Sequence, residues 1–145
     1  MFQSGEKRMA YSGPVADRLS IRELIETYND AVFRRDAEDW NNTWAEDAEW
    51  HIFGQVIKGR PDIVSMWKMA MQTFPYVGFF ALPGRINVSG NTATATVYVR
   101  ETIVQDGRVR AVEGKYSDDL IKQGNTWRFK CRRYEIVFDS DNQAE

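Results

Sequence analysis

Apolar residues recur every three or four positions along residues 17–35, a spacing that predicts an amphipathic helix. The apolar face of this helix consists of Ile21, Leu24, Ile25, Tyr28, Ala31 and Val32. Trp40 and Trp44 lie four positions apart, which predicts a second, short helix over residues 37–45 with both rings on one side. These two helices would follow one another directly.

A third helix is expected to begin at residues 59–62. Pro61 suits the first helical turn, because its missing N–H has no helical partner there. The apolar stripe of this helix includes Trp67, and Pro75 ends it.

The hydrophobic period changes to two in the second half of the chain, which is typical of strands. Strands are predicted there over residues 79–88 (interrupted at Pro83-Gly84), 92–104, 109–122 and 126–138, and two shorter strands over residues 48–53 and 55–58 precede the third helix. Glycine-containing turns of the hairpin kind separate the last four strands. Helices on one face of a curved antiparallel sheet make an α+β fold. We expect a cone-shaped α+β barrel, wrapped on the long N-terminal helix, with a cavity inside.

The length of 145 residues fits one domain, which we place at residues 17–138. Residues 1–16 are mostly polar and contain glycine and proline, so we expect a flexible N-terminal tail. Residues 139–145 show no apolar periodicity and are expected to form an acidic tail.

Charge and composition argue against several classes of protein. The 19 Lys and Arg against 21 Asp and Glu give a net charge of −2, whereas a nucleic-acid binder would show a basic face. No apolar run approaches the roughly 18 residues of a membrane span, and the N-terminus lacks the apolar core of a signal peptide. We therefore expect a cytoplasmic protein with neither a nucleic-acid nor a membrane partner.

Cys131 and His51 are the single cysteine and the single histidine of the chain. One cysteine excludes an intramolecular disulfide, and one residue of each type argues against a zinc site of the usual kind. The sequence also lacks a glycine-rich phosphate loop. No metal and no cofactor are therefore expected.

Several short segments together carry a resemblance to a known family. They are residues 17–25, 28–31, 35–36, 46–50, 59–63, 90–95, 114–120 and 127–129. In their order and spacing, over residues 17–138, the chain resembles the SnoaL-like branch of the nuclear transport factor 2-like superfamily. The resemblance implies the same cone fold. It also implies proton transfer by a carboxylate or histidine, as in the superfamily's dehydratases and isomerases, with a tyrosine or second acid assisting.

The resemblance places the superfamily's catalytic positions on this sequence only in part. Tyr28 matches the oxyanion-binding tyrosine of ketosteroid isomerases. The catalytic aspartate of scytalone dehydratase falls at Phe33, and the second histidine falls at Phe79 or Phe80, so the usual relay cannot be assembled. Asp30 or Asp36 could replace that aspartate through a shift of helix register, although Asp30 lies about 200° from Tyr28. The alternative for Asp30 is a solvated helical acid.

His51 alternates with Trp50 and Ile52, so only one of the two sets can face the interior. Burial of the larger apolar pair favours an outward His51, next to Glu49. The opposite alternation would make His51 a base that titrates near neutral pH. Tyr28 and Trp50 are both expected to be buried and to border one cavity between the first helix and the sheet.

The long strands offer further polar candidates. Glu101 would point inward if the apolar face of its strand meets the helices. Asp118 shares a face with Tyr116, and the resemblance to scytalone dehydratase implies that this face lines the pocket. Arg133 could pair with either acid, which would make a structural ion pair and is the alternative to catalysis.

Aromatic residues are abundant and could either line a cavity for a flat or alicyclic ligand or simply fill the core. The substrate-binding candidates are Trp44, Trp50, Trp67, Phe79, Phe80, Glu101, Tyr116 and Arg133. The catalytic candidates are Tyr28, Asp30, His51 and Asp118, with Glu101 as a further possible base.

Two functions from different classes are compatible with these residues. One is a cofactor-independent lyase or isomerase that acts on a small apolar or cyclic molecule. The alternative is a ligand-binding or subunit-assembly module of the same fold, without chemistry. The mixed threonine and tyrosine content of the outer face of residues 92–102 predicts a homo-oligomer, a dimer or alternatively a trimer.

Overall fold

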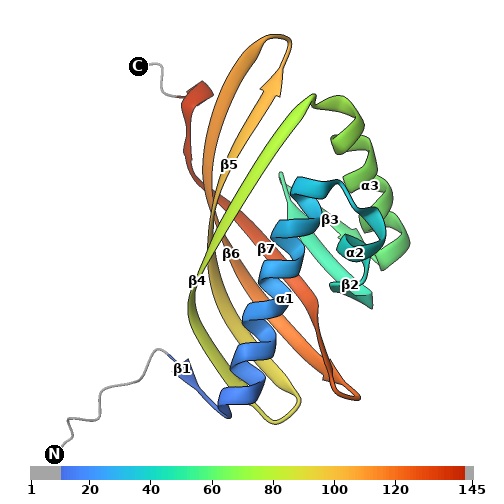
Figure 1. Ribbon diagram of the computed structural model, residues 1–145, viewed down its shortest axis with the longest axis vertical. Coiled ribbons are helices and arrows are strands. Elements are labelled where there is room, and N and C mark those ends of the chain that lie inside the picture. The colour runs from blue at the N-terminus through green and yellow to red at the C-terminus, as the bar shows by residue number, and fades with distance from the viewer. Residues whose placement is uncertain (1–10, 143–145) are drawn as a thin grey trace, which may run out of the picture.

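The computed structural model describes residues 11–142, in which one curved sheet of seven strands is combined with three α-helices (Figure 1). The elements in chain order are β1 (Tyr11–Ser12), α1 (Val15–Arg34), α2 (Ala37–Asn41), β2 (Trp44–Ile52), β3 (Gln55–Lys58), α3 (Arg60–Thr73), β4 (Tyr76–Ser89), β5 (Thr92–Gln105), β6 (Arg108–Gln123), β7 (Thr126–Asp139) and the 3-10 turn η1 (Ser140–Asn142). The strand order in the sheet is β1-β4-β5-β6-β7-β2-β3. The expected α+β class is confirmed, and the sheet does not close into a barrel.

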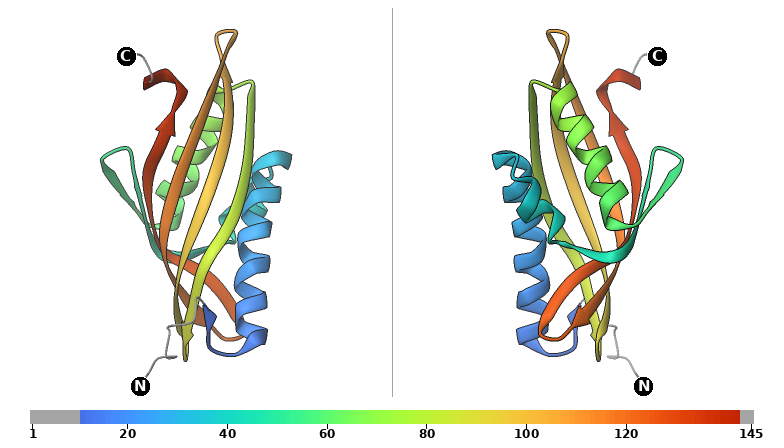
Figure 2. Two further views of the ribbon diagram at one scale, coloured as in Figure 1. Left: turned by 90° about the vertical axis from the view of Figure 1, so that its left-hand side faces the viewer. Right: turned by 90° about the vertical axis from the view of Figure 1, so that its right-hand side faces the viewer.

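The helices cover one face of the sheet. Figure 1 shows α1 crossing the lower half of the sheet and α3 lying beside the upper half, and Figure 2 shows α1 along one side of the long strands. The buried residues of α1 are Ile21, Ile25, Tyr28, Ala31 and Val32, as its spacing predicts. The helix ends at Arg34, and the next residue, Arg35, caps it in a left-handed conformation with φ of 55°. No helix within residues 11–142 is long and apolar enough to cross a membrane.

The second helix is shorter than the sequence predicts. It ends at Asn41, and Trp44 already belongs to β2. The hydroxyl of Thr43 donates to the carbonyl of Trp40, and this bond closes the turn between the two elements. Trp40 and Trp44 are both fully buried with their ring centroids 5.6 Å apart, so they meet from different elements. The two rings are therefore brought together by tertiary packing, and the four-residue spacing does not reflect one continuous helix.

The strand predicted over residues 79–88 is longer than expected and is not interrupted. Strand β4 runs through Pro83 with a register shift against β5 before Ile86. Within residues 11–142 the other edge of β4 pairs with β1 at Ile86 and Asn87. Pro83 adjoins the register shift, the kind of irregularity at which a sheet tolerates a proline.

The expected tails contain ordered structure. Strand β1 and the first residues of α1 lie within the segment 1–16, and residues 1–10 of that segment lie outside the described residues. At the other end β7 continues to Asp139, a buried residue whose carboxylate accepts two hydrogen bonds from Arg110. Residues 143–145 also lie outside the described part of the chain.

A β-bulge in β7 decides which side chains reach the interior. Asp119 pairs with Cys131 but Leu120 pairs with Phe129, so one extra residue, Lys130, is inserted in β7. A bulge reverses the alternation of side chains beyond it. Arg132 and Tyr134 therefore point to the helix-covered face, and Cys131 and Arg133 point to the outer face.

Candidate functional site

A buried ion pair lies at the centre of the helix-covered face. Arg132 donates from Nε and Nη2 to the two carboxylate oxygens of Asp118, at 2.8 and 3.0 Å. The two side chains are 1% and 0% exposed. The guanidinium carbon lies 3.8 Å from the ring centroid of Tyr116 and 4.6 Å from that of Tyr28. The Phe129 ring centroid lies 4.0 Å from the same carbon, so the positive charge is balanced by one acid and by the faces of three aromatic rings.

The expectation that Arg133 pairs with Asp118 or Glu101 is wrong. Arg133 lies on the outer face and donates to Asp119 at 2.9 Å. The physical reason is the bulge at Lys130, which exchanges the orientations of Arg132 and Arg133. Arg132 and Tyr134 are the interior residues that sequence reasoning missed. No local pattern reveals a one-residue insertion, because its evidence lies in the pairing with β6.

Tyr116 lies between the Asp118–Arg132 ion pair and two further aromatic residues, Trp50 and Tyr134. Its hydroxyl accepts a hydrogen bond from Nε1 of Trp50 at 3.1 Å, and both residues are buried. Its ring centroid lies 4.8 Å from that of Tyr134. Gly114 makes this approach possible, because a Cβ at that position would overlap the ring and hydroxyl of Tyr134. Burial raises the pKa of Tyr116 well above its usual value.

Glu101 is the acid of this face that has no cationic partner. Its carboxylate accepts a hydrogen bond from the Tyr134 hydroxyl at 2.9 Å, and no ion pair to it is formed within residues 11–142. Its register partners on the flanking strands are Phe79 and Val112, both buried. Burial raises the pKa of Glu101, while the Tyr134 hydrogen bond and the charge of Arg110 oppose that rise. The inward orientation expected for Glu101 is confirmed.

The electrostatic situation of Asp118 is different. Burial raises its pKa, and the charge and hydrogen bonds of Arg132 oppose the rise. Both carboxylate oxygens are already occupied by Arg132. A proton acceptor needs a free lone pair directed at the substrate, so this geometry suits a structural acid better than a base.

Tyr28 lies among the aromatic side chains of the interior. Its ring centroid is 5.3 Å from Trp40, 5.5 Å from Phe79 and 5.7 Å from Phe129. Trp44, Trp50, Trp67 and Phe79 are buried as well. Burial raises the pKa of Tyr28, and the charge of Arg132 opposes that rise. The expected burial of Tyr28 and Trp50 is confirmed, and the aromatic set forms a continuous packed layer.

Phe80 does not join that layer. It is 66% exposed and packs edge-on against Phe33 at the end of α1, with ring centroids 5.2 Å apart. Its alternate on β4, Phe79, takes the inward position. Phe33, where the resemblance places the catalytic acid, therefore touches Phe80 at the surface, whereas Phe79, the other position offered for the histidine, is buried.

Two catalytic candidates also lie outside the interior. Asp30 is exposed and pairs with Arg34 at 2.9 Å, which agrees with the solvated-acid alternative. His51 faces away from Trp50 and Ile52, with its Nε2 3.1 Å from the Glu49 carboxylate. Neither side chain can reach the groups around Glu101 without refolding its element. The outward orientation favoured for His51 is confirmed.

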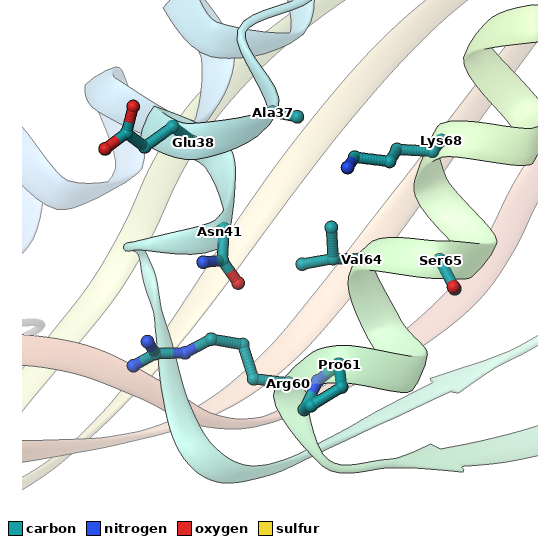
Figure 3. Close-up of a pocket in the computed structure, with 8 residues that line it drawn as sticks. All are labelled: Ala37, Glu38, Asn41, Arg60, Pro61, Val64, Ser65 and Lys68. Atoms are coloured by element: carbon teal, nitrogen blue, oxygen red, sulfur yellow. The ribbon is translucent and has the colours of Figure 1, made fainter.

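A surface pocket of about 550 Å³ lies between α2 and α3 (Figure 3). It is lined by Ala37, Glu38, Asn41, Arg60, Pro61, Val64, Ser65 and Lys68. The Arg60 guanidinium is engaged by the carbonyl of Trp44, at 3.0 and 2.7 Å. Figure 3 shows Lys68 reaching toward the pocket from α3, whereas the Glu38 carboxylate points away from it. This pocket lies apart from the buried polar groups and brings no base to its centre.

Tyr28 and Trp50 line none of five surface pockets on residues 11–142, and the cavity expected between them is not among these pockets. Trp40 packs between the two side chains, with its ring centroid 5.3 Å from that of Tyr28 and 5.6 Å from that of Trp50. Glu101 and Tyr134, by contrast, are only partly buried, so this hydrogen-bonded pair is accessible to solvent on the helix-covered face.

A curved sheet wrapped over a long helix, with polar groups on its inner face, defines the class of small cone-shaped α+β proteins. The SnoaL-like domain model matches residues 14–133, and the chain belongs to this family. It is 24% identical over 135 residues to Rv2910c, an uncharacterised protein of Mycobacterium tuberculosis, covering 90% of this chain and 91% of that protein.

Solved structures show the same fold. A proposed scytalone dehydratase from Novosphingobium aromaticivorans superimposes with a TM-score of 0.80 at 17% identity, over 90% of this chain and 91% of that chain. A type 2 hexachlorocyclohexane dehydrochlorinase, LinA, gives a TM-score of 0.78 at 18% identity, over 87% of this chain and 88% of that chain. At these identities the likeness concerns the fold alone.

Proposed function

We propose that this protein is a cofactor-independent lyase or isomerase that moves a proton on a small apolar or cyclic substrate, with Glu101 as the base. The observation that carries the proposal is the Glu101–Tyr134 pair on the helix-covered face. A carboxyl group whose pKa is raised by burial exchanges protons closer to neutral pH than an ordinary one. Tyr134 fixes the orientation of the carboxylate.

The relatives support a reaction of this type. Dehydratases and dehydrochlorinases, the activities named for two similar structures, remove water or hydrogen chloride from a carbon skeleton. Both eliminations require a base that takes a proton from carbon. Phe53, which is 63% exposed, has its ring centroid 6.4 Å from that of Tyr134, so an accessible apolar side chain lies beside the pair and suits a substrate without charge.

Proton abstraction can be tested without knowing the product. Small cyclic ketones and chlorinated alicyclic compounds would be incubated with the protein in D₂O, and exchange at carbon followed by NMR. We expect catalysed exchange for at least one compound, and a loss of about a hundredfold or more in Glu101→Gln. Asp30→Asn is the matched control and should keep the parent rate. Normal exchange in a folded Glu101→Gln protein would refute Glu101 as the base.

A binding module without chemistry is the second candidate. The phenylalanines at Phe33 and at both Phe79 and Phe80, the positions where the resemblance expects an acid and a histidine, favour it. This candidate predicts that a compound from the same set binds, as seen by chemical-shift changes, while no exchange occurs at any pH. Exchange that depends on Glu101 would eliminate it.

We also propose that the protein forms a homodimer through the outer face of β4, β5 and β7, with a trimer as the alternative. Leu82, Tyr98 and Val137 are 69%, 50% and 64% exposed on this face. They border a groove of about 290 Å³. Large apolar side chains gathered in one exposed patch are typical of association surfaces.

A further inference from the structure

Three side chains with metal-binding atoms meet on the outer face of the sheet. Glu49 and His51 lie two residues apart on β2 and therefore share a face, and Cys131 is the register partner of Glu49 on β7. One ligand atom from each residue lies within 4.8 Å of the other two. The closest pair is Nε2 of His51 and Oε1 of Glu49, at 3.1 Å.

This spacing is close to that of a coordinated ion. Zinc bonds of about 2.0 to 2.3 Å in a tetrahedron place neighbouring ligand atoms roughly 3.3 to 3.6 Å apart. The His51–Glu49 distance of 3.1 Å is about 0.2 Å shorter than this range, and the thiol of Cys131, within 4.8 Å of the other two atoms, needs to approach by about 1 Å; side-chain rotations supply both adjustments. The bulge at Lys130 is what places Cys131 on the outer face together with the other two residues.

The local charges are compatible with a divalent cation. A Cys131 thiolate and a Glu49 carboxylate together carry two negative charges, which match those of the ion. Two nearby cations are compensated by acids of their own, Arg133 by Asp119 at 2.9 Å and Lys130 by Asp47 at 2.6 Å. Lys58, the register partner of Glu49 on β3, is the remaining positive group beside the cluster.

We propose that Glu49, His51 and Cys131 bind one borderline-soft divalent cation such as Zn²⁺. Thiolate and imidazole ligands select zinc and its neighbours over magnesium or calcium. The Glu49 and His51 side chains are 40% and 34% exposed, so a fourth position faces solvent and takes water. Binding forms a metal–sulfur bond and releases the proton of the Cys131 thiol to solvent. The site lies on the face opposite Glu101 and takes no part in the proposed proton transfer.

Cobalt(II) is a suitable probe, because a thiolate bound to Co²⁺ gives a charge-transfer absorption in the near ultraviolet. We expect this band in the full-length protein to saturate at one Co²⁺ per chain and to be displaced by Zn²⁺. Cys131→Ser should abolish the band, and His51→Gln should weaken Co²⁺ binding by more than about tenfold, since even outer-sphere changes cost tenfold or more. Glu135→Gln, on the same strand but outside the cluster, should bind as the parent does.

A second measurement separates metal loss from misfolding. Zn²⁺ should raise the thermal unfolding temperature of the parent protein and of Glu135→Gln, but not of His51→Gln or Glu49→Gln. Absence of the charge-transfer band in the parent, or an unchanged band and affinity in His51→Gln, would overturn the proposal. Removal of the metal with EDTA should leave proton exchange on carbon unchanged, so the outcome is independent of the function proposed above.

Discussion

Arg132 and Asp118 are direct register partners on β7 and β6, and their side chains form two parallel hydrogen bonds in a fully buried setting. The pair occupies the place where the sequence suggested a catalytic acid. A carboxylate whose two oxygens are both held by one guanidinium stabilises the native arrangement of the strands. Glu101, further along the same face, forms no ion pair within residues 11–142 and is the base that we propose.

The first prediction concerns the stability of this pair. Asp118→Asn leaves the Arg132 charge buried without compensation, and we expect the free energy of unfolding to fall by about 3–5 kcal/mol. Chemical denaturation followed by tryptophan fluorescence measures it. Asp119→Asn, in the exposed pair with Arg133, is the matched control and should cost less than about 1 kcal/mol. Equal effects of the two substitutions would contradict the structural role of Asp118.

Gly114 permits the contact between Tyr116 and Tyr134, and its substitution tests that contact. In Gly114→Ala the new Cβ overlaps the Tyr134 ring, which must shift. We expect a loss of about 1–3 kcal/mol in stability, typical of overpacking, and a longer Tyr134–Glu101 distance. Ser117→Ala, at an exposed position of the same strand, should be close to neutral. A Gly114→Ala protein as stable as the parent would show that the Tyr134 ring lies elsewhere.

Tyr134 lowers the pKa of Glu101 through its hydrogen bond, against the larger effect of burial. Tyr134→Phe removes this hydrogen bond and keeps the ring. The pKa of Glu101 should therefore rise further, and the pH above which proton abstraction begins should move upward. Carbon-13 NMR of the Glu101 carboxyl group in both proteins measures the shift directly. A fall of the pKa in Tyr134→Phe would exclude the hydrogen bond seen here.

The raised pKa of Glu101 has a consequence for stability. Above the ordinary glutamate pKa of 4.5 and up to the raised value, the folded state holds a proton that the unfolded state has lost. Stability therefore decreases as the pH rises through this window. Glu101→Gln, whose amide oxygen can still accept from Tyr134, lacks this loss. We expect the variant to gain stability over the parent with increasing pH, as measured by thermal unfolding from pH 4 upward, and a constant difference would contradict the pKa rise.

Self-association through the outer face can be tested at Leu82, an exposed residue opposite Tyr98 in the β4–β5 pairing. A negative charge there opposes burial of the patch, so Leu82→Glu should be monomeric while the parent protein is dimeric. Light scattering at micromolar to high micromolar concentration measures the mass. Val109→Glu, an exposed apolar residue of β6 that does not border the groove, is the control and should leave the mass unchanged. A monomeric parent protein would refute the proposed interface.

Much of the fold is encoded locally. The spacing of Ile21, Ile25 and Tyr28 determines α1 and its buried face, because a helix presents residues three and four apart on one side. The alternation of Trp50 with His51 likewise determined that the tryptophan is inside and the histidine outside. In both cases a single element carries enough apolar residues on one face to settle its own orientation.

The identity of the interior polar residues was decided only by tertiary structure. Extending the alternation of β7 past Phe129 selects Arg133 for the interior, whereas the bulge at Lys130 selects Arg132 and Tyr134. Trp44 similarly joins Trp40 from a strand and not from a helix. A bulge depends on the pairing of two strands, so nothing within β7 alone specifies it. The hydrophobic period of a strand determines which of its side chains face the interior as far as the first bulge. Beyond the bulge, the pairing with the neighbouring strand determines which side chains face inward.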